Sequence, residues 1–316
     1  MSVLALTGGV GGAKLALGLY RVLPPTTLSL IVNTGDDMRH LGLSISPDID
    51  TLVYTLAGLV NTQTGWGRQN ETWSFMQALP TLGGADWFRL GDADLALHVL
   101  RTQRLSDGES LTRITLDMAR RLGLHARVLP MTDGLVATRI DTADGELDFQ
   151  DYFVAQRCQP VVTGLRYEGA AHVRPTAEVL QALHDPQLEA VLLCPSNPWL
   201  SLAPMLALPA LRQTLRDCKV PVVAVSPLVG GRAVKGPTDK IMAELGLPDS
   251  ALAVVQMYAD FLDGFVLDSR DAAIQAELDL PVCLEDTLMQ TLEDRERVAR
   301  RTLAFARQCP KRRRVP

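Results

Sequence analysis

Short apolar runs alternate with helix-forming segments along most of the chain. The first run covers residues 3–6, and behind it Ala16, Leu19, Tyr20 and Leu23 recur at the spacing of one helix face. This alternation continues in both halves and predicts an α/β fold with a doubly wound, mostly parallel Rossmann-like sheet. Later strands are expected at 28–32, 161–166, 190–194, 220–225, 253–257, 265–267 and 282–284. Helices are expected at 176–183, 201–206, 208–217, 238–245 and 285–308.

A long segment of helical pattern, from about 51 to 124, interrupts the alternation. Asp92 is the expected N-cap of a helix at 93–105, and a further helix is expected at about 109–122. So many helical residues exceed what one crossover needs. We therefore expect a helical insertion packed over the carboxyl ends of the strands.

The next segment, from about 126 to 154, has the pattern of paired strands. Strands are expected at 127–130, 135–141 and 146–154, with a hairpin turn at 144–145. This predicts an antiparallel excursion at the edge of the sheet. Because no linker or repeat separates these parts, we expect residues 1–316 to form a single domain.

The composition is that of a soluble globular protein. Of 316 residues, 47% are hydrophobic and 21% charged, and no run reaches the roughly 18 apolar residues of a membrane span. With no signal peptide and five scattered cysteines that form no CxxC pair, the chain is expected in the cytoplasm, without a zinc site. The net charge of −5 argues against a nucleic-acid partner, and the basic run 311–314 is interpreted as a solvated tail.

Glycines dominate the turn between the first strand and the first helix. Backbone N–H groups and a helix N-terminus at such a turn favour an anion such as a phosphate. The turn meets neither the Walker A motif nor the dinucleotide fingerprint, whose third glycine position is Lys14 here. A tight turn without a ligand is the alternative interpretation. The candidate phosphate-binding residues are Gly8, Gly9, Gly11, Gly12 and Lys14.

Four acids follow the second strand within fifteen residues. Asp36 and Asp37 come at its carboxyl end, and Asp48 and Asp50 lie in the first turn of a helix that begins at Ser46 and Pro47. Carboxylates near phosphates suit Mg²⁺, which predicts a metal-binding or hydroxyl-binding role. Acids at a helix start can equally stabilise the helix dipole alone.

Two later loops and a tryptophan-bearing loop are further candidates for ligand binding. Ser196-Asn197 and the loop 226–237 each follow a buried strand, so they lie at the same sheet edge as the glycine turn. Their binding candidates are Ser196, Asn197, Ser226, Gly230, Gly231 and Lys235. Trp66 with Arg89 offers a surface for a flat ring, although core packing is at least as common for tryptophan.

Six blocks together resemble a known family. They cover residues 7–15, 32–37, 46–51, 90–96, 195–198 and 225–237, and they resemble the 2-phospho-L-lactate transferases of coenzyme F420 biosynthesis. The resemblance implies transfer of a phospho-hydroxyacid, or phosphoenolpyruvate, from a guanosine diphosphate-linked donor to the deazaflavin Fo, with release of GMP. It also implies a Mg²⁺ requirement, a homodimer, and a guanylyltransferase that makes the labile donor.

Site residues carry over from the family by motif. The glycine turn and Lys14 would face the donor phosphates, and the two later loops would hold the guanosine. Asp36, Asp37, Asp48 and Asp50 would surround Mg²⁺ and the Fo hydroxyl, with Asp36 as principal metal ligand. Asp50 and Arg89 would contact Fo, and Asp50 would orient or deprotonate its hydroxyl. Family members often carry Arg or Lys where this chain has Ala93, so no contact is expected from that side chain.

Two other classes of function compete with this interpretation. One is a nucleotide-ligand-binding regulatory protein of the gluconeogenesis-factor-like type, without turnover. The other is an NAD-dependent oxidoreductase, which the broken fingerprint disfavours. No residue indicates whether the donor carries lactate, enolpyruvate or glycerate phosphate.

Overall fold

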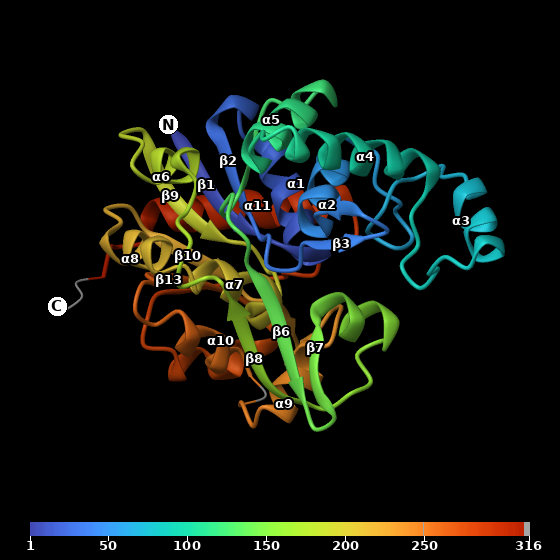
Figure 1. Ribbon diagram of the computed structural model, residues 1–316. Helices are drawn as coiled ribbons and strands as arrows, with labels where there is room; N and C mark the ends of the chain where they lie inside the picture. The colour runs from blue at the N-terminus through green and yellow to red at the C-terminus, as the bar shows by residue number, and fades with distance from the viewer. Residues whose placement is uncertain (249, 313–316) are drawn as a thin grey trace.

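A seven-stranded parallel sheet forms the centre of the computed structural model, which describes residues 1–248 and 250–312 (Figure 1). The strand order is β14-β13-β10-β9-β1-β2-β5, so the chain reverses its winding direction between β1 and β9. This is the expected doubly wound α/β sheet, which the structure confirms. The strands are β1 Ser2–Thr7, β2 Leu28–Val32, β5 Arg127–Pro130, β9 Leu188–Leu193, β10 Val222–Val225, β13 Gly264–Asp268 and β14 Val282–Glu285.

Helices cover both faces of this sheet, because side chains alternate between the faces along each strand. Val3 and Ala5 of β1 pack in one core with α1 (Gly9–Val22), α2 (Pro47–Leu56) and α11 (Leu292–Gln308). Leu4 and Leu6 of β1 pack in the core on the other face. The helices of that core are α6 Ala177–Leu183, α7 Ala203–Leu206, α8 Pro209–Asp217, α9 Thr238–Glu244 and α10 Ala251–Met257.

A second, antiparallel sheet lies below the main sheet in Figure 1. It consists of β6 (Ala137–Thr142), β7 (Gly145–Asp148) and β8 (Val162–Glu168), in the order β7-β6-β8. The expected hairpin turn joins β6 to β7, but β7 ends at Asp148 and a helical turn, Asp151–Ala155, follows.

Two predicted strands are present, but they pair with other strands than the sequence predicted. The strand expected at 127–130 is β5, which pairs in parallel with β2 in the main sheet rather than joining the antiparallel excursion. The strand expected at 161–166 is β8, which pairs antiparallel with β6 and not within the main sheet. A strand's own pattern shows which of its faces are buried, and it does not specify the direction of its partner.

The insertion after α2 contains less helix than expected. Its helices are α3 (Ser74–Ala78), α4 (Asp92–Ser106) and α5 (Leu111–Arg121), with a 3₁₀ turn after α3 at Leu79–Leu82. Figure 1 shows α3 standing out on one side of the molecule, beyond the end of α4. The N-cap of α4 is Gly91 rather than Asp92, whose carboxylate instead accepts the backbone N–H groups of Ser74 and Phe75.

A small hairpin, β3 (Met38–His40) and β4 (Leu43–Ile45), leads from β2 into α2. The remaining short elements are the helical turns Pro25–Thr27, Pro198–Leu202 and Ser269–Glu277, and the strands β11 Leu228–Val229 and β12 Arg232–Ala233.

Two further expectations near the C-terminus were wrong. Residues 253–257 form part of α10 and not a strand, because a short, mainly apolar run has no period that separates the two structures. The closing helix begins at Leu292 rather than 285, where Thr291 and Asp294 form a capping box.

The basic run at the C-terminus is partly anchored. The Lys311 ammonium lies 2.8 Å from the carboxylate of the buried Asp263, and the Arg312 N–H donates to the same group at 3.0 Å. These two residues are therefore not the solvated tail that was expected, and 313–314 lie outside the described residues. Within the described ranges, no helix is both long and apolar enough for a membrane crossing.

Candidate active site

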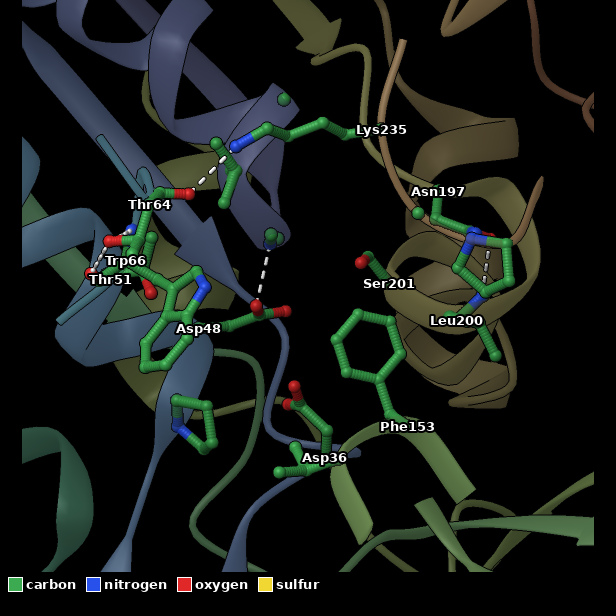
Figure 2. Close-up of a pocket in the computed structure, with 18 of the residues that line it drawn as sticks. Asp36, Asp48, Thr51, Thr64, Trp66, Phe153, Asn197, Leu200, Ser201 and Lys235 are labelled. Atoms are coloured by element: carbon green, nitrogen blue, oxygen red, sulfur yellow. Dashed lines mark hydrogen bonds between the residues drawn. The ribbon is translucent and has the colours of Figure 1, made fainter. Parts of the chain in front are cut away.

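One large cavity opens at the carboxyl ends of the parallel strands. It has a volume of about 640 Å³ and lies over the point between β1 and β9 where the winding reverses. Its lining comes from the glycine turn, the loops after β2, β9 and β10, the insertion, and the turn after β7. Asp36, Asp48, Phe153 and Ser201 are directed into this common space (Figure 2). Ligands of open α/β sheets bind at this position.

The glycine turn forms one wall of the cavity. Gly8, Gly9 and Gly11 line it, and α1 begins at Gly9, so the N-terminus of the helix faces the cavity. The Gly9 N–H donates to Asp48 Oδ1 at 2.7 Å, and the Gly8 N–H donates to Ser196 Oγ at 3.0 Å. The positive end of a helix dipole and a buried carboxylate therefore meet at this wall.

Two predicted nucleotide-binding residues lie behind the turn instead of in the cavity. A Cβ at Gly12 would meet the hydroxyls of Ser196 and Thr7, so this glycine allows two loops to pack closely. Ser196 is buried, and its hydroxyl is used by the backbone of the turn. Neither Gly12 nor Ser196 lines the cavity. In the structure both residues serve the close packing of the turn.

Asp36 and Asp48 form a buried pair of carboxylates at the cavity. The side-chain amide of Asn33 donates to both, at 3.1 Å to Asp36 Oδ1 and 3.0 Å to Asp48 Oδ2. Burial raises the pKa of Asp48 to about 6, against the hydrogen bonds from Asn33 and Gly9. Burial, followed by the charges of Asp48 and Asp37, raises the pKa of Asp36 well above its usual range. A divalent cation would balance this concentrated negative charge, and Mg²⁺ is bound by one or two carboxylates together with phosphate oxygens.

The other two predicted acids have protein partners. Asp37 Oδ2 accepts a hydrogen bond from Ser46 Oγ at 2.7 Å, and the Asp37 side chain does not line the cavity. Ser46 is the N-cap of α2, as expected. Its hydroxyl donates to Asp37 and makes no capping hydrogen bond with the backbone of the helix. Asp50 lines the cavity, but both of its oxygens contact the buried guanidinium of Arg101. Among the described residues, no three His, Cys, Asp or Glu side chains are grouped as metal ligands.

Two lysines stand near the glycine turn. Lys14 Nζ donates to the Met289 carbonyl at 2.8 Å, and burial, Arg295 and Lys235 lower the pKa of Lys14. Lys235 Nζ donates to the Thr64 carbonyl at 2.8 Å, which joins the loop after β10 to the insertion across the cavity (Figure 2). Both side chains line the cavity and supply positive charge at its glycine-turn end.

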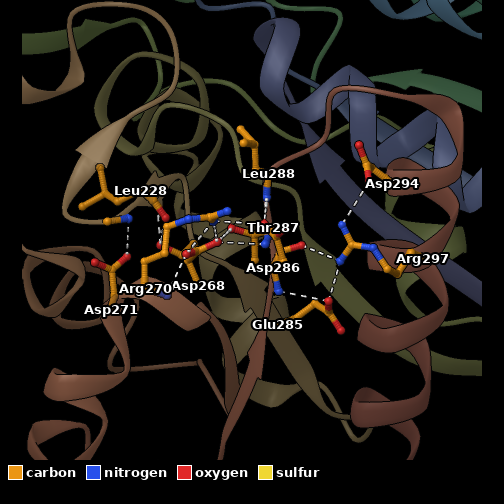
Figure 3. Close-up of polar contacts among 12 residues, drawn as sticks. Leu228, Asp268, Arg270, Asp271, Glu285, Asp286, Thr287, Leu288, Asp294 and Arg297 are labelled. Atoms are coloured by element: carbon orange, nitrogen blue, oxygen red, sulfur yellow. Dashed lines mark hydrogen bonds and ion pairs between the residues drawn. The ribbon is translucent and has the colours of Figure 1, made fainter.

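The loops after β9 and β10 contribute less to the cavity than predicted. Asn197 and Ser226 line it, but Asn197 caps the following helical turn through Oδ1 and donates to Thr238 through Nδ2. Gly230 and Gly231 form the β11–β12 turn and do not line the cavity. The Gly230 N–H donates to Asp271 Oδ2 at 3.1 Å (Figure 3).

A polar network fixes the strand ends beneath these loops. Buried Asp268, at the end of β13, accepts the N–H and hydroxyl of Thr287 and the guanidinium of Arg270 (Figure 3). Arg297 of α11 donates to the Asp286 carbonyl at 2.7 Å. Thr287 lines the cavity, so this network holds part of its wall in place.

Aromatic side chains also line the cavity. Trp66 is 54% exposed at the rim, which argues against core packing for this residue. The Arg89 guanidinium lies 4.3 Å from the ring centre of Trp73, and Arg89 lines the cavity. Phe149 and Phe153 are stacked with their ring centres 5.4 Å apart. This phenylalanine pair was not predicted from the sequence, because residues 146–154 were assigned to a strand and not to the helical turn that stacks the two rings.

The fold and cavity define a doubly wound α/β protein with a large cavity where the winding reverses. Residues 3–301 match the family model described as 2-phospho-L-lactate transferase CofD. The chain is 37% identical to the 2-phospho-L-lactate transferase of Methanosarcina mazei, over 94% of this chain and 98% of the relative. It is also 37% identical to the phosphoenolpyruvate transferase of Streptomyces coelicolor, over 97% of this chain and 98% of the relative. The chain belongs to the 2-phospho-L-lactate transferase CofD family and is a transferase.

A solved structure supports the fold alone. The structure of a UPF0052 family member from Bacillus halodurans matches 96% of this chain and 99% of its own, with a TM-score of 0.61. Its sequence identity is 12%, so this similarity concerns the architecture and not the chemistry of the site.

Proposed function

We propose that the protein transfers a phospho-hydroxyacid from a guanosine diphosphate-linked donor to the deazaflavin Fo in the cytoplasm, releasing GMP and forming (dehydro-)coenzyme F420-0. The observation that carries the proposal is the contact between Gly9 and Asp48, where a helix N-terminus meets a buried carboxylate pair. An anion site and a cation site side by side suit a diphosphate with its metal ion. The names of the relatives, a 2-phospho-L-lactate transferase and a phosphoenolpyruvate transferase, favour the same chemistry.

The donor end of the cavity is the glycine-turn end. We assign the diphosphate to the N-terminus of α1 and to Lys14 and Lys235, whose ammonium groups would offset its charge. Asp36 and Asp48 would hold Mg²⁺, and Asn33 keeps the two carboxylates together. When bound, Mg²⁺ supplies charge neutralisation on the phosphate oxygens of the donor.

We assign the acceptor to the aromatic side chains of the cavity lining. Trp66 and Phe153 offer faces on which a flat deazaflavin ring stacks, and Arg89 would contact its polar groups. Asp50 lines the cavity, and we assign it the role of orienting the attacking hydroxyl of Fo. Protein catalysis of such transfers depends mainly on positioning and charge neutralisation. A role for Asp50 in orientation fits a carboxylate held on both oxygens by arginine.

For the transferred acid we propose only its class, a phospho-hydroxyacid or phosphoenolpyruvate, and not which acid it is. 2-Phospholactate, phosphoenolpyruvate and 3-phosphoglycerate differ by a methyl, methylene or hydroxymethyl group. We also propose that the protein is a homodimer and that a guanylyltransferase supplies the labile donor.

The direct test mixes the protein with Fo, Mg²⁺ and each of the three guanosine diphosphate-linked donors. We expect GMP release and a product whose mass is that of Fo plus the free phospho-acid less one water, with one donor preferred. Asp36→Ala should raise the Mg²⁺ requirement sharply, and an unchanged titration would remove Asp36 from the metal site. Nucleotide binding without GMP release for all three donors would instead indicate a regulatory binding protein.

A further inference from the structure

Helix α4 places a buried arginine directly behind Asp50. Arg101 is 2% exposed and does not line the cavity, while Asp50 does. Arg101 Nη1 lies 3.0 Å from Asp50 Oδ2, and Nη2 contacts Asp50 Oδ1, so the guanidinium holds both carboxylate oxygens. The two residues are 51 positions apart in the sequence, and no motif of the chain includes Arg101.

Stability alone does not explain this pair. Removing two charges from water costs more than a buried ion pair commonly returns, and apolar side chains of similar volume often stabilise a protein as well. A two-point contact between guanidinium and carboxylate does, however, fix the carboxylate's orientation. Because Asp50 is at the cavity wall, the fixed orientation applies to a group that can reach a ligand.

A second pair on α4 extends this arrangement. His98 Nε2 lies 3.2 Å from Asp94 Oδ2, and the Tyr54 hydroxyl donates to Asp94 Oδ1 at 2.5 Å. His98 Nδ1 faces Arg101 at 3.4 Å and Asp50 at 3.7 Å. His98 thus lies between Asp94, which faces its Nε2, and the Arg101–Asp50 pair, which faces its Nδ1. Two turns of α4 are joined to α2 by these charged and polar contacts.

We propose that Arg101 is a positioning residue for the transfer reaction and acts through Asp50. The guanidinium holds the Asp50 carboxylate in the orientation that aligns the acceptor hydroxyl, and His98 limits movement of the guanidinium from the other side. This role rests on the proposed function, in which Asp50 contacts the acceptor. Arg101 affects the rate of transfer and does not contribute to donor binding, because the donor phosphates lie at the glycine-turn end.

The test compares kcat, the KM for Fo and the donor affinity in wild-type protein and five variants. Arg101→Gln should lower kcat by about 100-fold, the loss associated with a misplaced reacting group, and leave donor affinity unchanged. Arg101→Lys keeps the charge but loses the two-point contact, and we expect an intermediate kcat. Arg104→Gln is the matched control, since Arg104 lies on the same helix and pairs with Glu109 and Asp117 away from the cavity. It should keep the wild-type kcat.

Asp50→Asn combined with Arg101→Gln separates positioning from a structural role. If Arg101 acts through Asp50, the double variant should lose no more activity than Asp50→Asn alone. Losses that multiply, or a folded Arg101→Gln variant with wild-type kcat, would overturn the proposal. If Arg101→Gln does not fold, Arg101→Lys carries the same comparison. Wild-type protein that releases no GMP would contradict the proposed function itself, independently of the variants.

Discussion

The backbone N–H of Gly9 donates a hydrogen bond to Asp48 Oδ1 at 2.7 Å. The contact joins the first residue of α1 to the first turn of α2, 39 positions along the chain. It places a carboxylate of the proposed metal site against the turn proposed for the donor phosphates. A metal ion held there would lie between protein carboxylates and ligand phosphate, which is how Mg²⁺ is commonly bound.

Loss of the Asp48 charge should weaken the metal site. Asp48→Asn keeps the size of the side chain and removes a carboxylate, and we expect the Mg²⁺ concentration for half-maximal GMP release to rise at least about tenfold. Asp37→Asn is the matched control, because Asp37 is a partly buried aspartate of the same loop region that does not line the cavity. A Mg²⁺ titration that shifts equally in both variants would contradict the assignment.

Stability of the metal-free protein should fall as the carboxylate pair ionises. The pKa of Asp48 is raised to about 6 by burial, so folding favours its protonated form. This contribution to the free energy of unfolding, on the order of 1–3 kcal/mol, is fully present below about pH 4, the pKa of a free Asp side chain. It is lost as the pH rises through about 6.

Mg²⁺ should therefore raise the melting temperature more at about pH 8, where the pair is ionised, than at about pH 5. Thermal unfolding with and without Mg²⁺ at the two pH values measures the difference. Asp48→Asn should reduce it, and an equal Mg²⁺ effect at both pH values would argue against a metal ion at this pair.

Close packing at the glycine turn should make Gly11 intolerant of a side chain. A Cβ there would lie 2.5 Å from the Pro195 carbonyl oxygen, and a backbone atom cannot move aside as a side chain can. We expect Gly11→Ala to lower the free energy of unfolding by about 1–3 kcal/mol, measured in urea. Gly42→Ala, at a positive φ of 78° with open space around it, controls for backbone strain and should cost about 1 kcal/mol.

Trp66 should bind the acceptor and contribute little to stability. Its side chain is 54% exposed at the cavity rim. Trp66→Leu should raise the KM for Fo about fivefold, which corresponds to about 1 kcal/mol of lost stacking, with an unchanged free energy of unfolding. Trp73→Leu is the contrasting variant, because Trp73 packs in the small core beneath the insertion and should lower stability. A reversed pattern would show that Trp66 serves in packing.

Much of the main sheet could be predicted from local pattern. The strand at Leu28–Val32 has the predicted bounds, and the glycine turn lies where the winding reverses. Asp36, Asp48 and Asp50 line one cavity because parallel strands present their following loops at one edge. These features follow from short apolar runs and from the turn chemistry of glycine and proline.

The pairing of strands and the contacts between residues far apart in the chain could not be predicted from the sequence. The direction of β8 depends on its partner β6, and the helix at Ala251–Met257 has an apolar pattern equally suited to a strand. Arg101 showed no signal beyond its place in a helix, since its contact with Asp50 arises from the packing of α4 on the hairpin and α2. Asn33 could have been recognised as a polar residue directly after a buried strand.

The central claim is that a metal ion on Asp36 and Asp48 meets a diphosphate over the glycine turn. Anomalous diffraction from crystals grown with GDP and Mn²⁺ in place of Mg²⁺ tests it most directly. The account predicts one Mn²⁺ peak in contact with both carboxylates and with a phosphate oxygen, while Asp50 remains on Arg101. A Mn²⁺ ion bound away from this pair, or a nucleotide outside the cavity, would contradict the account.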